Sequence, residues 1–248
     1  MDTDRQNLTH HISKRFNREL EDLTNRVLRM GGMVEQQLND ALQAVTNGDE
    51  SLARHVIDHD YQLNAMEVEI DEECVTILAR RQPAAGDLRL VFAMLKTITD
   101  LERVGDEAKK IAKLALKLAE SKWSDRRYTE IASLGWYASD MLHQVLDALA
   151  RMDTNLALEI VKKEEVVDRE YEIIMRQIIT YMMEDPRTIT RSLEAAWAAR
   201  ALERIGDHAR NIAEDVIYLV KGKDVRHTDM IDVEASVHPQ GVHPKTPT

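Results

Sequence analysis

An internal repeat is the feature that most restricts how this chain can fold. The segment LERVGD at 101–106 recurs 101 positions later as LERIGD at 202–207. Four residues that precede the first copy of this segment also recur, 104 positions later. Asp49, Leu52, Ala53 and Asp60 correspond to Asp153, Leu156, Ala157 and Glu164, respectively. The turns around Pro83 and Pro186 absorb the difference between the two offsets. Together the matches predict a duplicated structural unit of about a hundred residues.

Each copy of this unit is expected to be helical. The 248 residues include only five Pro and nine Gly, and aromatic residues make up 4%. A β-sandwich or barrel would need more turn residues and more β-branched or aromatic alternation. Along 6–46 the apolar side chains recur in steps of three and four, as in a helix with one buried face. Within it, Gly31 and Gly32 mark either a slight bend or a close approach by another backbone. The sequence therefore predicts an all-α protein.

Turn and capping residues divide the chain into six expected helices. The breaks fall at Asn47-Gly48-Asp49, Pro83, Asp153-Thr154 and Asp185-Pro186. The expected helices lie at about 6–46, 50–81, 84–120, 126–152, 154–184 and 187–222. We therefore expect two tandem three-helix bundles related by internal duplication, at 1–120 and 126–222, joined by a linker at 121–125.

Residues 223–248 are expected to form a disordered tail. They hold three of the five Pro and three of the nine His, without apolar periodicity, and so offer no face to bury. A metal-binding role for His227, His238 and His243 is the alternative.

Charge and composition exclude several classes of function. The net charge of −11 argues against nucleic acid as the main partner, because phosphate binding depends on basic side chains. A local basic patch remains compatible with this charge. No run of about 18 apolar residues and no secretory signal is visible, so no transmembrane segment is expected. The chain has no GxxxxGK or GxGxxG segment for nucleotide chemistry. The single cysteine, Cys74, is expected to be a small core residue.

Acidic residues spaced four apart are the candidate functional residues. The pairs are Glu102–Asp106, Glu164–Asp168 and Glu203–Asp207, together with Asp60–Asn64, in which an amide takes the second place. Residues at this spacing share a helix face, where like charges repel each other. On a helical projection the pairs fall within the apolar arcs of their helices or at the edge of them. We therefore expect these side chains on packed faces, where an uncompensated charge is costly.

The distance of the pairs from the turns predicts that they meet. The two pairs of the second half are equally far from the Asp185-Pro186 turn, and the two pairs of the first half are equally far from Pro83. Equidistant residues of an antiparallel hairpin lie side by side, so each hairpin should gather four oxygen-bearing side chains about 30 Å from its turn. Arg103 and Arg204 project about 100° away from the adjoining glutamates. A metal ion or multinuclear cluster is then the expected compensation.

An all-oxygen ligand set suits Mg, Mn, Ca or Fe better than a structural zinc ion. Glu67 and Asp71 lie on the same arc, but their counterparts Tyr171 and Met175 are poor ligands, which favours a structural or partner-facing role for them.

Two alternatives to a metal-binding regulator remain open. One is a scaffold whose acids are only salt-bridged. The other is a di-iron carboxylate enzyme or metal-storage bundle, although the two Glu-x-x-His motifs of that class are missing.

At these residues the sequence resembles the PhoU family, the phosphate-specific transport system accessory proteins. The resemblance runs from about His10 to Gly222 and includes four kinds of segment: MGGMVEQ at 30–36, RRQP at 80–83, DLR at 87–89 and both copies of LER(V/I)GD. The metal-cluster motif of the family, E(D)xxxD, is matched at Glu102–Asp106, Glu164–Asp168 and Glu203–Asp207. The fourth copy departs from it, because Asn64 replaces an acid and removes one negative charge from the first site.

This resemblance implies a regulator rather than an enzyme. Family members are cytoplasmic, are commonly dimeric and damp the phosphate-starvation response when phosphate is plentiful. They connect the Pst phosphate transporter, through its ATPase subunit, to the PhoR sensor kinase. We therefore expect a non-enzymatic negative regulator of the Pho regulon and of phosphate uptake. It would be a cytoplasmic homodimer, peripheral to the inner membrane through its partners, with a divalent metal or a metal cluster on each hairpin.

Overall fold

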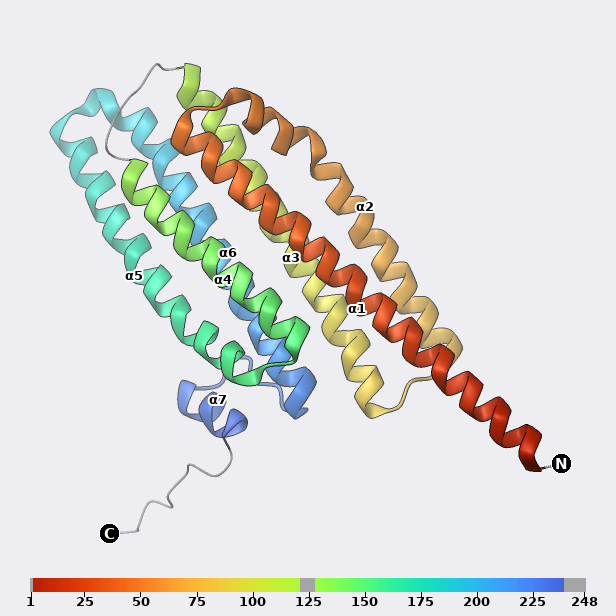
Figure 1. The fold of residues 1–248 in the computed structure, drawn as a ribbon. Helices are drawn as coiled ribbons and strands as arrows, with labels where there is room; N and C mark the ends of the chain where they lie inside the picture. Colours follow the sequence, from red (N-terminus) through yellow and green to blue (C-terminus); the bar gives the residue numbers. More distant parts are fainter. Residues whose placement is uncertain (1, 121–127, 239–248) are drawn as a thin grey trace, which may run out of the picture.

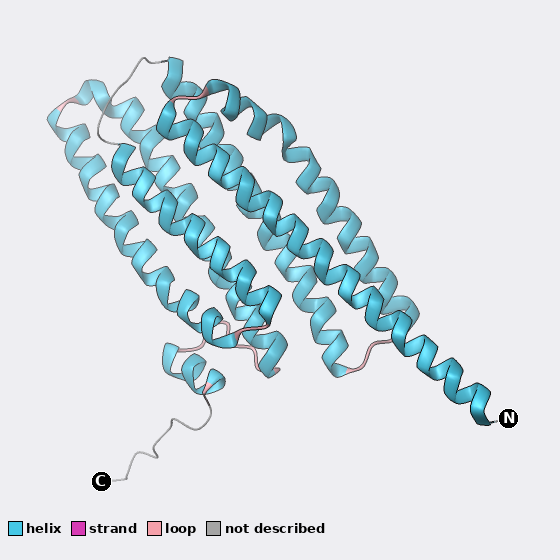
Figure 2. Ribbon diagram, in the orientation of Figure 1, coloured by secondary structure: helices cyan, strands magenta, loops and turns pink. Residues whose placement is uncertain are grey.

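The computed structural model describes the backbone of residues 2–120 and 128–238, and the side chains of 14–117 and 131–238. The described residues form one 3-10 turn, Pro186–Thr188, and seven α-helices: α1 (Asp2–Asn47), α2 (Glu50–Arg81), α3 (Ala85–Glu120), α4 (Tyr128–Arg151), α5 (Thr154–Glu184), α6 (Ile189–Lys221) and α7 (Met230–Val237). They contain no strand, which confirms the expected all-α class (Figure 2). The expected linker at 121–125 and the end of the tail, with His243, lie outside the described residues.

Capping residues place the ends of the helices close to the expected breaks. The Asp49 carboxylate accepts a hydrogen bond from the backbone N–H of Leu52, and the Asp153 carboxylate accepts from Asn155 and Leu156. These two N-caps begin equivalent helices, α2 and α5, in the two halves. At the other end of α2, Gln82 adopts a left-handed conformation with φ of 48°, which ends the helix before Pro83.

The two halves fold as antiparallel three-helix bundles that lie side by side (Figure 1). The first contains α1, α2 and α3, and the second α4, α5 and α6. Helix α1 packs on α4 and helix α3 packs on α6, so the buried apolar side chains of both bundles form one continuous core. Helices α2 and α5 contact only their own bundle among these six and lie on the outer flanks.

Two glycines let α1 and α4 approach closely. Gly31 on α1 faces Leu146 on α4, and Gly135 on α4 faces Leu42 on α1. A Cβ atom at either glycine would overlap the facing leucine. The two glycines are 104 positions apart, and so are the two leucines. The two glycine–leucine contacts are therefore equivalent under the internal repeat. Close approach by a neighbouring helix, rather than a bend, therefore accounts for Gly31, while Gly32 faces open space.

Ion pairs fix the register of the antiparallel helices α3 and α6. Among the described residues, three ion pairs of Lys or Arg cross this seam: Lys96–Asp215 (2.9 Å), Glu107–Arg204 (2.5 Å) and Lys117–Glu194 (3.8 Å). In each pair, the α3 residue lies as many positions from Gly105 as the α6 residue lies from Gly206, but in the opposite direction along the chain. An approximate two-fold axis therefore passes between the two copies of the LER(V/I)GD segment.

The expectation of a disordered tail is wrong for residues 223–238. This segment turns back after α6 and ends in α7, which packs against α5 and α6. Val225, Val233 and Val237 are each at most 3% exposed, and Glu234 forms an ion pair with Lys162 of α5. All three Pro of the tail lie beyond His238. The composition of 223–248 as a whole is therefore dominated by the residues after His238 and does not reveal the short apolar segment that forms α7. His227 and His238 are exposed and join no three-ligand group among the described residues.

None of the described helices is both long enough and apolar enough to cross a membrane.

Candidate metal centre

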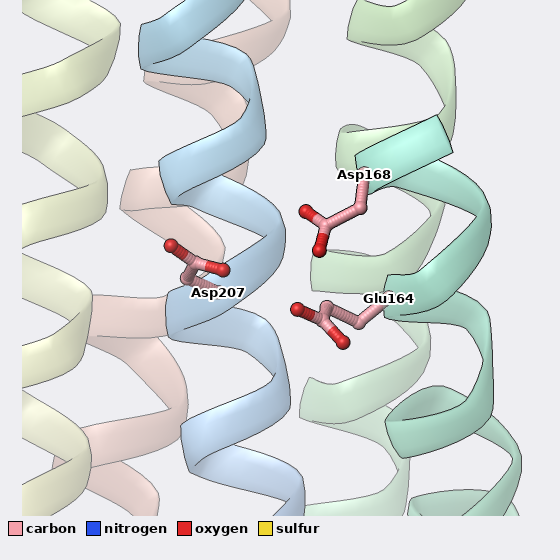
Figure 3. A group of neighbouring side chains, drawn as sticks. All are labelled: Glu164, Asp168 and Asp207. Atoms are coloured by element: carbon pink, nitrogen blue, oxygen red, sulfur yellow. The ribbon is translucent and has the colours of Figure 1, made fainter. Parts of the chain in front are cut away.

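Helices α5 and α6 bring the acids of the second half to one level. Glu164 and Asp168 lie one turn apart on α5, and Asp207 faces them from α6 (Figure 3). Gly206 permits this approach, because a Cβ atom there would lie 3.1 Å from Cγ1 of Val167 on α5. The three carboxylates therefore meet where the spacing from the Asp185-Pro186 turn predicts.

Three carboxylate oxygens, one each from Glu164, Asp168 and Asp207, lie within 4.8 Å of one another. Within the described part of the chain, this is the one group of three or more Asp, Glu, His or Cys ligand atoms so close together. Glu164 is buried and the two aspartates are partly buried. Oxygens at these separations can bind one cation, since oxygen ligands lie about 2.0–2.6 Å from Mg²⁺ or Ca²⁺.

Glu203, the fourth predicted ligand of this hairpin, lies one turn before Asp207 and outside the group of three. Its side chain is buried. One carboxylate oxygen, Oε1, accepts a 2.6 Å hydrogen bond from Arg200. The other, Oε2, is buried and has no hydrogen-bond partner. A buried acceptor without a partner is costly, and a bound cation would satisfy it.

Burial and repulsion raise the pKa values of Glu164, Glu203 and Asp207. The pKa of Glu203 rises to about 7, chiefly because burial disfavours the charged form and next because Asp207 is close. Burial, followed by the charge of Asp168, raises the pKa of Asp207. Burial also raises the pKa of Glu164, against the opposing effect of Arg210. The hairpin therefore holds negative charge that its own cations neutralise only in part.

Two arginines supply that partial neutralisation. Arg200 donates to Glu203, whereas Arg210 donates to Glu164 at 2.9 Å and to Glu214 at 3.1 Å. Arg210 thus divides its charge between two carboxylates. A metal ion is therefore not the only possible compensation for these acids, although Arg204, which adjoins Glu203, pairs with Glu107 on α3 instead.

The donor set of the second hairpin fits a hard divalent cation. Four carboxylates face two guanidinium groups, one of which is shared with Glu214. Carboxylate oxygens are the ligands that Mg²⁺, Mn²⁺ and Ca²⁺ favour, and Fe²⁺ also accepts them. His208 follows Asp207 in the sequence, but its Nδ1 lies 2.8 Å from Asp100 Oδ1 on α3. That contact directs it to the seam between the bundles.

The first hairpin repeats this arrangement with different neighbours. Asp60 on α2 is 2% exposed, and both of its oxygens have partners: Gln37 at 3.1 Å and Lys109 at 2.7 Å. Burial raises the pKa of Glu102 on α3, and the nearby charges of Asp106, Glu67 and Asp60 add to the effect. In the described residues of this hairpin, no three acids bring oxygens as close together as in the second.

The helical projection predicts Asn64 on the packed face of α2, and this prediction is wrong. Its side chain is exposed, although Asp60 one turn earlier is buried. Helix α2 is an outer helix that packs only on α1 and α3, so its buried arc is narrower than the projection assumes. Glu67 is partly buried, and its pKa is raised by burial and by Asp71. Asp71 itself is exposed.

Sequence reasoning missed two equivalent basic residues, Lys109 and Arg210. Lys109 contacts Asp60, and Arg210 contacts Glu164. The two cations are 101 positions apart and the two acids 104 apart, which are the offsets of the repeat. An equivalent ion pair therefore joins the two helices of each hairpin. Alignment of the two halves could have found both cations.

Comparison with known proteins agrees with this duplication. The PhoU domain matches the chain twice, at residues 27–115 and 131–216. A PhoU homolog from Pseudomonas aeruginosa, described as a phosphate-specific transport system accessory protein, is 54% identical over 230 residues, which cover 93% of this chain and 95% of the relative. The phosphate-specific transport system accessory protein PhoU of Escherichia coli is 52% identical over 224 residues, which cover 89% and 91%.

Solved structures show the same architecture. The crystal structure of PhoU from Pseudomonas aeruginosa has a TM-score of 0.82 at 54% identity and covers 84% of this chain and 100% of that one. The phosphate transport system regulatory protein PhoU from Streptococcus pneumoniae has a TM-score of 0.78 at 30% identity and covers 85% and 99%. The helical class and the duplication are thereby confirmed, and the chain belongs to the PhoU family.

Proposed function

We propose that this protein is a non-enzymatic negative regulator of the phosphate-starvation response and of phosphate uptake. The observation that carries the proposal is the match of both halves to the PhoU domain. Relatives that align over nearly their whole length are named phosphate-specific transport system accessory proteins, and one solved relative is titled a regulatory protein of that system. An accessory protein acts by contact with its partners rather than by turnover of a substrate.

The proposed partners are the ATPase subunit of the Pst phosphate transporter and the PhoR sensor kinase. The protein would connect the two from the cytoplasm, as a homodimer held at the inner membrane by these partners. Association with the transporter is supported by the names of the relatives. Long helices with exposed outer faces, such as α2 and α5, offer extended surfaces of the kind that partner proteins bind.

We further propose that the second hairpin binds a divalent metal or a small metal cluster, with Mg, Mn or Fe favoured over structural zinc. Glu164, Asp168 and Asp207 would supply the first ligands, and the unpartnered Oε2 of Glu203 would complete them. In the first hairpin the proposed ligands are Glu102, Asp106, Asp60 and Asn64. The metal would neutralise carboxylates and hold the two helices of each hairpin together, without reacting itself.

Gene deletion and complementation test the regulatory proposal. Deletion should raise the expression of phosphate-scavenging genes in phosphate-rich medium, and the wild-type gene should restore repression. Repression that survives deletion would contradict the proposal. Purified protein should also capture the transporter ATPase and the kinase. If it instead hydrolyses phosphate esters or nucleotides at a rate that E203Q/D207N abolishes, the non-enzymatic assignment fails.

A further inference from the structure

A basic pocket lies on the seam between α3 and α6, away from the acidic hairpin sites. It has a volume of about 260 Å³ and is lined by Lys110, Lys113, Leu114, Lys117, Trp197 and Ala198. The lysines occur at steps of three and four on α3 and therefore share one face. Trp197 on α6 is 62% exposed, and the Nζ of Lys117 lies 5.9 Å from the centre of its ring.

Positive charge is in excess around this pocket. Lys110 and Arg204 both pair with the single buried carboxylate of Glu107, at 2.9 Å and 2.5 Å. Lys117 lies 3.8 Å from Glu194, and Lys113 is exposed with no ion pair among the described residues. Four cations thus face two carboxylates, in a chain whose net charge is −11.

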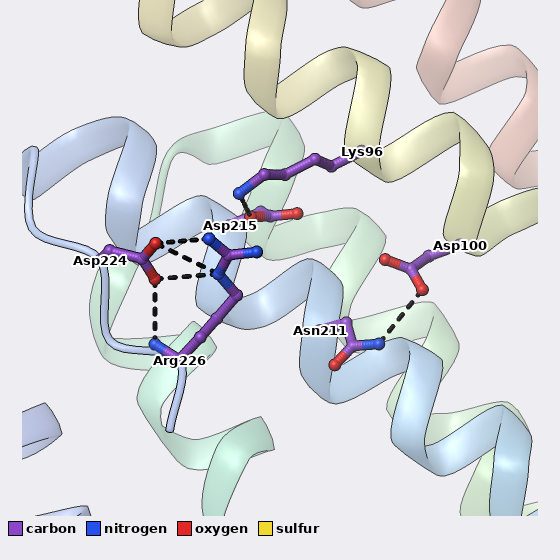
Figure 4. A network of polar contacts seen from close by, with 6 residues as sticks. All are labelled: Lys96, Asp100, Asn211, Asp215, Asp224 and Arg226. Atoms are coloured by element: carbon purple, nitrogen blue, oxygen red, sulfur yellow. Dashed lines mark hydrogen bonds and ion pairs between the residues drawn. The ribbon is translucent and has the colours of Figure 1, made fainter. Parts of the chain in front are cut away.

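The two-fold axis of the duplication supplies an internal comparison. A groove of about 540 Å³ lies at the equivalent place on the other side of the axis, where its lining residues Asn211, Glu214 and Asp215 replace Lys110, Lys113 and Leu114. Tyr218, at the position equivalent to Lys117, lies outside the lining. There two polar contacts join the helices (Figure 4): Lys96 donates to Asp215, and Asn211 donates to Asp100. Arg103, which also lines this groove, has no ion pair among the described residues.

The aromatic contact is also exchanged across the axis. On one side the Nζ of Lys96 on α3 lies 5.1 Å from the centre of the Tyr218 ring on α6. On the other side Lys117 on α3, equivalent to Tyr218, lies beside Trp197 on α6, equivalent to Lys96. The fold thus tolerates an internally paired seam at this place. The exposed lysines and indole of the basic pocket are therefore not a requirement of helix packing.

We propose that this basic pocket binds a nucleotide, with its phosphates against Lys110, Lys113 and Lys117 and its base against Trp197. Lysine ammonium groups bind phosphates as point charges, and an indole face stacks on any base. The described residues that line the pocket include no amide or hydroxyl side chain to read base edges, so we expect them to recognise charge and a flat apolar ring. The net charge of −11 opposes the approach of large anionic surfaces, whereas a small ligand experiences mainly the local charge.

Binding of ATP to the full chain tests this site. Calorimetry in EDTA prevents ATP from binding through a metal at the carboxylates. Wild-type protein should bind ATP, K113Q should weaken binding about tenfold, since a charged phosphate contact is lost, and K110Q/K113Q/K117Q should abolish it. W197L should weaken ATP binding but leave the binding of inorganic triphosphate unchanged. K221Q/K223Q, which alters two exposed lysines outside the pocket, is the matched control and should bind as wild type does.

Three results would overturn the proposal. The first is an ATP affinity that the triple lysine variant retains, with circular dichroism showing that it is folded. The second is equal loss of ATP and triphosphate binding in W197L, which would leave no role for a base. The third is lysine-dependent binding to phosphatidylglycerol vesicles without any binding of ATP, which would identify the pocket as a lipid contact.

Discussion

Arg204 on α6 forms a 2.5 Å ion pair with the buried Glu107 on α3, and this contact joins the two bundles. Its counterpart in the first half, Arg103, is exposed and has no ion pair among the described residues. The asymmetry arises because His208 takes the place of Glu107 across the axis and pairs with Asp100. Glu107 is 3% exposed in its side chain, whereas the side chain of Arg204 is 42% exposed.

We expect R204M to destabilise the protein by about 1–2 kcal/mol. Breaking a buried ion pair costs about 3–5 kcal/mol, but Arg204 is partly exposed and Lys110 still contacts Glu107, so the loss should be smaller. The matched variant R103M should change the free energy of unfolding by less than about 0.5 kcal/mol, as surface substitutions do. Urea unfolding of both proteins measures this difference. Equal effects would show that Arg204 does not stabilise the interface.

Truncation after Gly222 should lower the melting temperature by about 5 °C or more. The deletion removes Val225, Val233 and Val237, each at most 3% exposed, and burial of one such side chain contributes about 1.5 kcal/mol or more. For a chain of this size, 1 kcal/mol shifts Tm by about 2–4 °C. V233D in the full chain is the companion variant and should act in the same direction. An unchanged Tm in both would mean that α7 does not stabilise the bundle.

Asp215 should make stability depend on pH. Burial raises its pKa to about 6, against the lowering effect of Lys96. The folded state therefore holds a proton that the unfolded state releases at lower pH. The resulting stabilisation is complete below the unfolded pKa of about 4 and is lost as the pH rises to about 6.

The variant D215N lacks this proton equilibrium but keeps an oxygen acceptor for Lys96. Relative to wild type, it should gain up to about 3 kcal/mol of stability between pH 4 and pH 7. Chemical unfolding at several pH values measures the difference. D100N is a poor control because Asp100 also binds His208, so D232N on the exposed face of α7 serves instead. A difference between D215N and wild type that stays constant with pH would contradict the expectation.

The repeat made the helical architecture and the level of the acids predictable. Offsets of 101 and 104 residues define the two hairpins, and distance from the turn places Glu164 beside Asp207 without knowledge of tertiary structure. Lys109 and Arg210 are 101 residues apart, so the same repeat relates them, although neither adjoins a glutamate of the LER(V/I)GD segments. The leucine–glycine contacts between α1 and α4 follow the other offset, of 104 residues.

Other features depend on packing that a single helix does not encode. The exposure of Asn64 follows from the outer position of α2, which only the assembled bundle defines. The register of α3 against α6 is set by contacts such as Lys96–Asp215 between bundles. Helix α7 is short, and its three buried valines were hidden by the proline-rich sequence that follows His238.

Metal binding at the second hairpin should raise the melting temperature of the protein. In chelator, the carboxylates of Glu164, Asp168 and Asp207 repel each other across a partly buried space, which opposes the packing of α5 on α6. A cation that binds only the folded state stabilises it by about 2.7 kcal/mol at one hundred times its dissociation constant, or several degrees of Tm.

The variant D168N/D207N should lose most of this Mn²⁺-dependent gain while becoming more stable than wild type in chelator. Both effects follow from one cause, because the substitutions remove negative charge and leave the shape nearly unchanged. The exposed pair E165Q/E172Q on α5 is the matched control and should behave as wild type does. Thermal melts in EDTA and in Mn²⁺, together with elemental analysis of untagged protein, measure the outcome. If D168N/D207N keeps the full Mn²⁺-dependent gain, the ion binds elsewhere; if it is less stable than wild type in chelator, the acids serve as structural hydrogen-bond acceptors rather than as a charge cluster awaiting a cation.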